Sequence, residues 1–168
     1  MRYTLRAMSR DDARAICGWR YEGPYAVYDM DVEGIGADVL EAEMLDLRSP
    51  WFAVRDDSGE LIGFFAFGTA AELGGYSTPH LFDEDGILSI GLGMRPDMTG
   101  KGAGLDFVNA GLRFARERFA PRAFRLYVMS WNHRAIRVYE RAGFQWADTV
   151  IQHTPSGERE FIEMRRDA

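Results

Sequence analysis

One segment, residues 86–119, restricts the fold of this chain more than any other. Its first part, GILSIGLGM (86–94), is an apolar run typical of a strand, and LDFVNAGLRFARERF (105–119) repeats apolar residues at helical spacing. Between them lie Pro96 and the stretch TGKGAG (99–104), in which every second residue from 100 onward is glycine. A helix start offers unpaired backbone N–H groups and a partial positive charge, and glycines let a ligand approach the backbone closely. The segment therefore predicts an anion-binding loop that suits a pyrophosphate.

The loop carries Lys101, the only lysine of the chain, which could add a mobile positive charge at the edge of such a site. Two other phosphate-binding patterns do not fit. A P-loop needs a glycine where Arg95 stands and a serine or threonine where Gly102 stands. The dinucleotide pattern needs G-x-G-x-x-G, whereas the spacing here is G-x-G-x-G. A glycine-rich turn without a ligand is the alternative that the loop by itself leaves open.

The other hydrophobic patterns predict a mixed α/β domain, with strand–helix–strand units in its second half and hairpins in the middle and at the end. Ser9 is the expected N-cap of the first helix and Asn132 that of the last, with Gly143 just past the end of the last helix. The chain contains no internal repeat or linker, so residues 1–168 are expected to form one domain. The expected strands are 3–8, 51–55, 61–68, 86–94, 123–129, 144–153 and 159–165, the expected helices are 9–19, 36–48, 105–119 and 132–143, and the longer loops are 20–31 and 69–85.

Charge and cysteine content exclude several classes of partner. The formal net charge is −6, which does not favour binding to nucleic acid or to an anionic membrane surface. No apolar run is long enough to span a bilayer. Cys17 is the only cysteine, which fits a reducing, cytoplasmic setting. The three histidines, His80, His133 and His153, lack metal-ligand spacing, so no metal is expected.

A second motif lies in NHRAIRVYERAGF (132–144). Asparagine, alanine, tyrosine, glycine and phenylalanine stand there in the pattern N-x-x-A-x-x-x-Y-x-x-x-G-F. Together with the glycine loop, this motif resembles the GNAT superfamily of acetyl-CoA-dependent N-acetyltransferases. The phosphate loop of that family reads Arg or Gln, x, x, Gly, x, Gly or Ala after a proline, and this register falls on residues 99–104, with Thr99 in place of Arg or Gln. The resemblance also covers residues 51–67 and the order of the elements.

The resemblance implies a fold, a cofactor and the residues that bind it. The fold would be a central mixed, mostly antiparallel sheet with flanking helices, forming a single N-acetyltransferase domain. Acetyl-CoA would lay its pantetheine arm along residues 89–94 like an added strand, with backbone groups near Leu92 and Met94 binding the arm and the acetyl oxygen. Thr99 could still donate a hydroxyl, and Lys101 and Arg95 would partly replace the missing charge. The implied cofactor-binding residues are Leu92, Met94, Thr99, Gly100, Lys101, Gly102, Ala103, Gly104, Asn132 and Tyr139.

The resemblance makes Tyr139 the expected general acid, because a phenol can give a proton to the leaving thiolate. The alternative for Tyr139 is packing of its helix against the sheet. A carboxylate or a water chain would take the proton of the amine. The candidates are Glu22, Glu84 and Asp85, with His80 behind them, although charged loop residues are usually just solvated. A tyrosine-rich segment that holds Tyr21, Tyr25 and Tyr28, with Trp19, could wall the acceptor site, bind a cation or pack on the core.

The leading hypothesis is therefore an N-acetyltransferase that moves acetyl from acetyl-CoA to a primary amine by direct attack in a ternary complex. The amine could belong to a small molecule or to a protein, and the acidic balance of the chain favours a cationic one. One alternative is a non-catalytic module of the same fold that binds or senses acyl-CoA. A phosphoryl-transfer enzyme is disfavoured because the P-loop is missing. The exposed faces of the last hairpin could pair two chains into a homodimer.

Overall fold

Seven strands form one sheet in the order β1-β2-β3-β4-β5-β7-β6, and every neighbouring pair is antiparallel except β4 and β5, which are parallel. The computed structural model describes residues 1–73 and 78–168. The expected mixed, mostly antiparallel sheet with flanking helices is thus confirmed. The elements are β1 Thr4–Ala7, α1 Arg10–Cys17, the 3₁₀ turn η1 Gly23–Tyr28, α2 Ala37–Met44, β2 Trp51–Arg55, β3 Leu61–Phe67, η2 Gly68–Ala71, β4 Ile87–Met94, η3 Pro96–Met98, α3 Gly104–Phe119, β5 Ala123–Met129, α4 His133–Arg141, β6 Gln145–Thr154 and β7 Gly157–Asp167.

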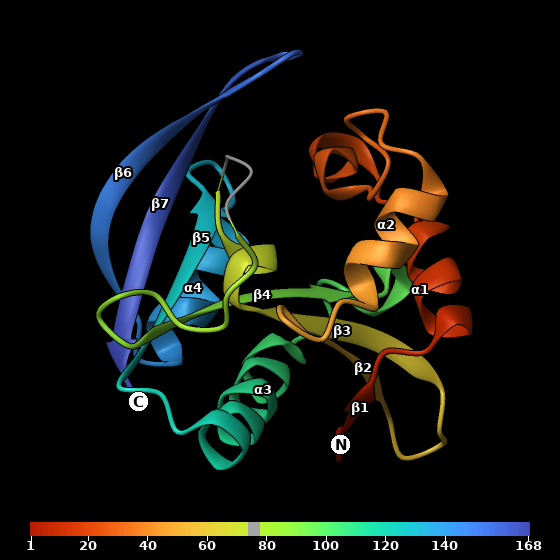
Figure 1. The fold of residues 1–168 in the computed structure, drawn as a ribbon, viewed down its shortest axis with the longest axis horizontal. Helices are drawn as coiled ribbons and strands as arrows, with labels where there is room; N and C mark the ends of the chain where they lie inside the picture. Colours follow the sequence, from red (N-terminus) through yellow and green to blue (C-terminus); the bar gives the residue numbers. More distant parts are fainter. Residues whose placement is uncertain (74–77) are drawn as a thin grey trace.

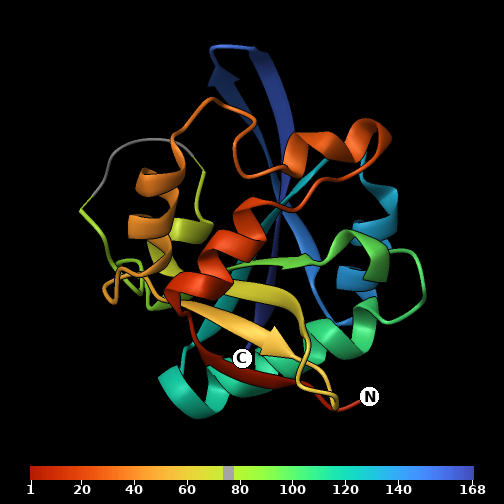
Figure 2. The ribbon, with the colours of Figure 1, turned by 90° about the vertical axis from the view of Figure 1, so that its right-hand side faces the viewer.

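Helices cover both faces of the sheet. In Figure 1, α3 lies below β2, β3 and β4, whereas α1 and α2 lie together on the other side; Figure 2 shows the same arrangement from the side of α1. The larger core packs Phe65, Phe107 and Phe124 between the sheet and α3, and all three side chains are fully buried. A smaller core joins α1 and α2 to Ala53 and Phe64. Each large apolar side chain that folding buries in these cores contributes about 1.5–3 kcal/mol.

The parallel pair β4–β5 is short, and this shortness creates the opening at the centre of the molecule. Their pairing begins where Ile87 lies opposite Ala123 and already ends where Ser89 lies opposite Arg125. Beyond that point β4 stays with β3 and β5 stays with β7, so the two strands diverge, as Figure 1 shows. The connection between them is η3, the glycine loop and α3, a strand–helix–strand unit of the kind that parallel pairing requires.

The expected helix caps are confirmed. Ser9 and Asp12 form a reciprocal capping box at α1. The Asn132 side chain accepts a hydrogen bond from the backbone of Ala135 at the start of α4, and Gly143 follows the end of α4 with φ = +91°. A glycine is favoured there because other residues resist this left-handed conformation.

Two expectations about local structure were wrong. The second helix ends at Met44 rather than at residue 48, because residues 46–49 form a turn in which Arg48 bonds to the Asp46 carboxylate. The segment expected to be a plain loop at 20–31 contains η1, whose first turn begins with Gly23 and Pro24. Proline suits this position because its φ is already fixed near the helical value and its missing N–H would have no partner there.

Side chains on neighbouring elements explain why glycine stands at positions 91 and 93 of β4. A Cβ on Gly93 would lie 2.4 Å from the ring of Phe64 on the paired strand β3. A Cβ on Gly91 would lie 3.3 Å from Cβ of Ala71 in η2. The two glycines therefore let β4 keep a regular register while its neighbours pack tightly over it.

The hairpin β6–β7 extends well beyond the helices in Figure 1. Most of β6 is exposed, including Trp146 and Ile151, so the outer edge of the sheet is open to solvent. Pairing of two chains through this hairpin stays a prediction. No described helix combines the length and the apolar character needed to cross a membrane.

Candidate active site

The divergence of β4 and β5 opens a pocket of about 370 Å³ that passes between the two strands. Its walls are β4 from Ile90 to Met94, β5 from Leu126 to Val128, the glycine loop with the start of α3, the inner face of α4, and η1. The two sequence motifs, which lie about thirty residues apart, thus meet on one cavity. This is the geometry that both motifs together predicted.

One wall of the pocket is an open strand edge. The backbone N–H of Arg95 donates to the Ile62 carbonyl of β3. Backbone N–H and C=O groups alternate in direction along a strand, so those of Gly93 also face β3. The backbone groups of Leu92 and Met94 therefore face the pocket. In agreement, the Tyr21 hydroxyl donates from the pocket side to the Met94 carbonyl at 2.7 Å. An extended arm of a ligand could pair with this edge as an added strand.

The glycine loop forms the second wall. Gly100 and Gly102 have φ values of +72° and +82°, which other residues rarely adopt. Gly104 begins α3, and a Cβ there would lie 3.2 Å from the Val138 side chain of α4, so this glycine allows α3 and α4 to pack closely. The N-cap of α3 is Ala103, which has no side-chain oxygen to bond the N–H groups of the first turn. Alanine costs a helix about 1 kcal/mol at this position, a cost that a bound anion would offset.

Three side chains that were expected to assist ligand binding at the loop either bond to other groups or lie outside the pocket. The hydroxyl of Thr99 donates to the Pro96 carbonyl at 2.8 Å, so it closes the η3 turn and does not point a donor at a ligand. The Arg95 guanidinium is bound to Asp97 at 2.6 Å and to Glu60 at 3.3 Å, so its charge is already neutralised. Lys101 is exposed and is not among the residues that line the described pocket.

A positive charge does lie beside the loop, on Arg134, which sequence reasoning missed. Its Nη1 lies 3.2 Å from the position of a Cβ on Gly100, and its guanidinium stacks on the ring of Tyr25 with 4.3 Å between Cζ and the ring centroid. The residue lines the pocket from the first turn of α4. A signal was present, because the helix dipole disfavours a cation in a first turn unless an anion lies nearby.

Asn132 and Tyr28 join the second motif to η1. The Asn132 side chain uses its oxygen to cap α4 and its Nδ2 to donate to the Tyr28 hydroxyl at 2.9 Å. Burial is the main cause that raises the pKa of Tyr28, and the bond from Asn132 opposes this effect. Asn132 therefore holds both α4 and the tyrosine segment in place, and any contact with a ligand would require it to exchange partners.

Tyr139 lies on the same pocket, half-buried on the inner face of α4. Its ring contacts Phe144 edge-to-face with centroids 6.2 Å apart. Burial raises the pKa of its phenol well above the ordinary value, and the neighbouring Tyr28 adds to the shift. The phenol is therefore protonated across the physiological pH range, as a proton donor must be.

The expected bases are not brought to this pocket. Glu22, Glu84 and Asp85 are exposed, and none of them is among the residues of the described chain that line it. His80 is turned toward Glu72, with Nε2 3.1 Å from a carboxylate oxygen, and that hydrogen bond is the main cause that raises the pKa of the imidazole. Nothing about these side chains in the sequence could reveal their directions, because all four lie in loops.

Two of the three roles considered for the tyrosine-rich segment, a pocket wall and packing on the core, fall to different residues of it. Tyr21, Tyr25 and Tyr28 all line the pocket. Trp19 instead packs against Phe64 in the smaller core, with 6.4 Å between ring centroids. The segment is therefore anchored to the core at its start and forms a pocket wall along η1.

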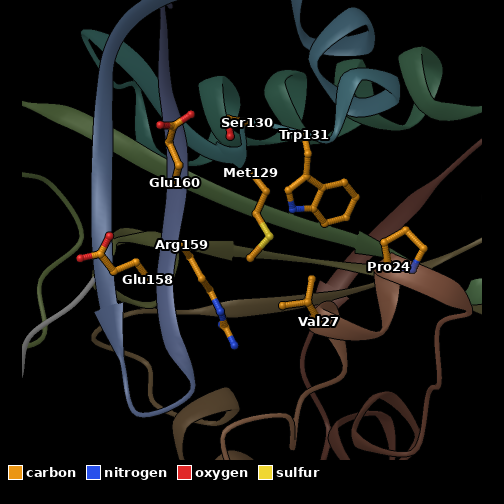
Figure 3. A pocket seen from close by; sticks show the side chains of 8 residues that line it. All are labelled: Pro24, Val27, Met129, Ser130, Trp131, Glu158, Arg159 and Glu160. Carbon is orange, nitrogen blue, oxygen red and sulfur yellow. The ribbon is translucent and has the colours of Figure 1, made fainter.

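A second cavity of about 390 Å³ lies beside the first, between η1 and the ends of β5 and β7. Figure 3 shows the side chains of Val27, Met129, Trp131 and Arg159 around it. Trp131 also packs against Tyr25 and Tyr28, with centroids 5.5 Å and 6.1 Å away, so one aromatic wall continues from the first pocket to the second.

The mouth of this second cavity is held by an ion pair. The guanidinium of Arg159 on β7 bonds to the carboxylate of Glu33, which follows η1. In Figure 3, the carboxylates of Glu158 and Glu160 point away from Val27 and Arg159. The cavity lining is thus mixed: an apolar and aromatic part made by Pro24, Val27, Met129 and Trp131 faces a polar part made by Ser130, Glu158, Arg159 and Glu160.

Comparison with known proteins agrees with both motifs. The family model described as the acetyltransferase (GNAT) family matches residues 11–144. The mycothiol acetyltransferase of Propionibacterium freudenreichii is 32% identical over 130 residues, which are 72% of this chain and 38% of that protein. The protein of the same name from Streptomyces coelicolor is 35% identical over 111 residues, 62% of this chain and 31% of that protein. The chain thus spans about a third of the length of these relatives.

Solved structures share the fold over nearly the whole chain. A chimera of the spermidine N-acetyltransferase SpeG from Vibrio cholerae and hSSAT has a TM-score of 0.77 at 20% identity, over 99% of this chain and 96% of that one. A structure of the Vibrio cholerae spermidine N-acetyltransferase described as dodecameric has a TM-score of 0.69 at 20% identity, over 98% of this chain and 93% of that one. At this identity the likeness shows the fold.

Proposed function

The chain belongs to the GNAT family of acetyltransferases, and from that premise we propose that it binds acetyl-CoA between β4 and β5 and transfers the acetyl group to a primary amine by direct attack. The observation that carries the proposal is the meeting of three features on one pocket. These are the open edge of β4, the uncapped start of α3 and the protonated phenol of Tyr139. Each has a use in acetyl transfer from a thioester, and none requires another cofactor.

The pyrophosphate of the cofactor would bind at the glycine loop. The N–H groups of the first turn of α3 would cap it, and the Arg134 guanidinium beside Gly100 would neutralise part of its charge. Thr99 and Lys101 would contribute mainly through the backbone, because the Thr99 hydroxyl is used within η3. Gly102 would allow close approach, since nothing lies within 4 Å of a Cβ built there.

The pantetheine arm would pair with the pocket edge of β4. The backbone of Leu92 would hold the arm, and the groups near Met94 would become available once Tyr21 gives up the Met94 carbonyl. An N–H group aimed at the acetyl oxygen would stabilise the negative charge that develops there during attack. The edge therefore both positions the thioester and polarises it.

In the chemical step the amine nitrogen would attack the thioester carbon. A carbon–nitrogen bond forms, the carbon–sulfur bond breaks, and the electron pair leaves with the sulfur. Tyr139 would then give its proton to the thiolate. The pKa of a phenol is ordinarily above that of a thiol, and burial raises the pKa of Tyr139 further, so the phenol keeps its proton until the thiolate forms.

The acceptor would reach the thioester through the second cavity and along the aromatic wall of Trp131, Tyr25 and Tyr28. Of the four acidic residues around η1, Asp31 is paired with Arg20 and Glu33 with Arg159. Glu22 and Asp29 form no ion pair within the described residues, and this remaining negative charge favours a cationic amine over an anionic one. Spermidine, the acceptor in the names of the structural relatives, is one such amine and belongs in any first screen.

Two measurements test the proposal. Calorimetric titration with acetyl-CoA, CoA and ATP should show binding of the two CoA forms and none of ATP. Thiol release from acetyl-CoA should then be measured with a panel of amines: spermidine, tyramine, glucosamine, and peptides with a free α-amine or a free lysine. Binding without thiol release for every amine would favour the non-catalytic acyl-CoA-binding module, which the engaged Thr99 hydroxyl leaves as the second candidate. Absence of CoA binding would refute both.

A further inference from the structure

We propose that Tyr127 and Glu163 accept the proton that the amine loses, with the Tyr127 hydroxyl taking that proton while it passes its own to the Glu163 carboxylate. This proposal rests on the proposed function, since it concerns the acceptor half of the same reaction. It fills the role for which Glu22, Glu84, Asp85 and His80 were expected. None of those four side chains reaches the described pocket.

Tyr127 has the right place for this role. It stands on β5 two residues after Arg125, the last residue of β5 that pairs with β4, and it lines the pocket where the strands diverge. Its neighbours Leu126 and Val128 are buried in the core with α3, so strand alternation turns Tyr127 to the opposite face. Met129 shares that face and lines the second cavity. Tyr127 therefore lies on the path between the entry of the amine and the thioester.

Glu163 gives the hydroxyl a proton acceptor. It is directly opposite Tyr127 on β7, and the Tyr127 hydroxyl donates to Oε1 of Glu163 at 3.1 Å. Glu163 is only 8% exposed, which is unusual for a carboxylate. Burial is the main cause that raises the pKa of Tyr127 to about 12, so the phenol stays protonated between turnovers. The Tyr127 hydroxyl can therefore receive one proton while it passes its own to Glu163, without ionising itself.

Two arginines lie beside the Glu163 carboxylate. Arg165 on β7 donates from Nε to Oε2 of Glu163 at 3.1 Å, and Nε of Arg125 on β5 lies 3.9 Å from Oε1. From β6, Asp148 pairs in register with Glu163 but is exposed. Two further carboxylates face Arg125 from the segment that precedes β4, namely Glu72 at 3.1 Å and Asp83 at 3.0 Å. Arg125 thus contacts three carboxylates, and its contact with Glu163 is the longest of the three. Oε1 of Glu163 therefore serves mainly as the acceptor for the Tyr127 hydroxyl.

The step balances without another reactant. The bound amine is an ammonium ion, so before attack one N–H proton moves to the Tyr127 oxygen while the phenol proton moves to Oε1 of Glu163, which frees the nitrogen lone pair. After attack on the thioester, the nitrogen releases a second proton to solvent water. The tyrosine ends neutral and Glu163 ends as a carboxylic acid. The thiolate takes its proton from Tyr139, so the products are the amide and free CoA. Release of one proton from Glu163 and uptake of one by Tyr139 restore the protein.

The test compares Tyr127→Phe and Glu163→Gln with the wild type. The probes are acetyl-CoA and whichever amine of the panel (spermidine, tyramine, glucosamine or a peptide amine) the wild type acetylates fastest. At pH 7 each variant should lose about 100-fold in kcat/KM for the amine, the lower range of a general-base effect. Affinity for acetyl-CoA, measured by calorimetry, should change less than twofold. Tyr3→Phe is the matched control, because it removes a buried hydroxyl that has no partner within the described residues and lies outside the pocket.

The pH profile separates a proton relay from a structural role. Without the relay, only amine that has already lost its proton to water can react, so the rate of the variants should rise with pH up to the pKa of the amine. The deficit should therefore shrink from about 100-fold at pH 7 to a few-fold at pH 9.5. A deficit that is constant with pH, or no deficit, overturns the proposal. A wild type that releases no thiol with any amine of the panel, the peptides included, removes the proposed function first, and the relay with it.

A second readout needs no acceptor. Tyrosine ring carbons can be followed by NMR through a pH titration, and Tyr127→Phe identifies the signal. Removal of the charge in Glu163→Gln should lower the pKa of Tyr127 from about 12, because Glu163 raises it. An unchanged titration would show that the two side chains are not coupled and would overturn the proposal.

Discussion

Arg134→Gln is expected to weaken acetyl-CoA binding more than any other change of a single charged side chain. The guanidinium lies beside Gly100, where the pyrophosphate would bind, and neither Arg95 nor Thr99 offers a free donor there. Glutamine keeps much of the length of the side chain and removes the charge. The effect should therefore report the charge rather than a loss of packing.

The magnitude follows from two opposing contributions. A charged hydrogen bond to a phosphate contributes about 1.5–3 kcal/mol. Arg134 already stacks on Tyr25 at 4.3 Å in the free protein, an exposed contact worth about 0.5–1 kcal/mol that it would partly give up on binding. The difference is about 1–2 kcal/mol, which corresponds to a rise in Kd of about 5- to 30-fold.

Calorimetry with acetyl-CoA at low and moderate salt is the assay. The wild-type affinity should fall as salt rises, and the affinity of Arg134→Gln should fall less, because one charge no longer contributes. Arg137→Gln is the matched control, since Arg137 stands one turn further along α4, is exposed and bonds only to the His133 carbonyl in the described residues. A change of less than twofold for Arg134→Gln, or an equal change for Arg137→Gln, would refute the assignment of Arg134 to the cofactor.

Three further changes test the pocket and the core. Tyr139→Phe should lower kcat by about 100-fold or more with acetyl-CoA affinity unchanged, because it removes only the donated proton; an unchanged kcat excludes Tyr139 as the acid. Gly102→Val should abolish cofactor binding in a folded protein, since φ is +82° there and the space for a Cβ is open to the ligand; wild-type affinity by calorimetry would contradict this. Gly111→Ala should cost about 1–3 kcal/mol in urea unfolding, because its Cβ would lie 2.2 Å from the buried ring of Phe65. Gly36→Ala is its control, with nothing within 4 Å of the new Cβ, and an equal loss there would argue against overpacking.

The sequence predicted the scaffold well because the features that set it are local. Strand alternation, the Ser9 and Asn132 caps and the glycine beyond α4 each depend on a few neighbouring residues, and the structure has them where they were expected. The glycine loop could be located for the same reason. The mixed sheet then follows from the order of elements and from the short strand–helix–strand connection.

The directions of side chains could not be predicted, because they depend on contacts between distant segments. Arg95 closely precedes the glycine loop in sequence, but its guanidinium bonds to Asp97 and to Glu60 on the β2–β3 hairpin, which lies 35 residues away in the chain. Arg134 was overlooked because its closeness to Gly100 exists only after α3 and α4 pack. Tyr127 and Glu163 are likewise separated by 36 residues and meet only because β7 pairs with β5.

The tyrosine segment shows how the two halves of the site depend on each other. Each of its three pocket tyrosines contacts a residue of the cofactor wall: Tyr21 bonds to the Met94 carbonyl, Tyr28 accepts from Asn132, and Tyr25 stacks on Arg134. In the free protein the groups proposed to hold the cofactor therefore hold η1. A bound cofactor would compete for at least the Met94 carbonyl and the Arg134 guanidinium, and so would loosen η1 at the moment when an amine has to pass it. Cofactor binding and the position of η1 are therefore coupled. The coupling runs through the side chains of Tyr21, Tyr25 and Tyr28, which all line the one pocket.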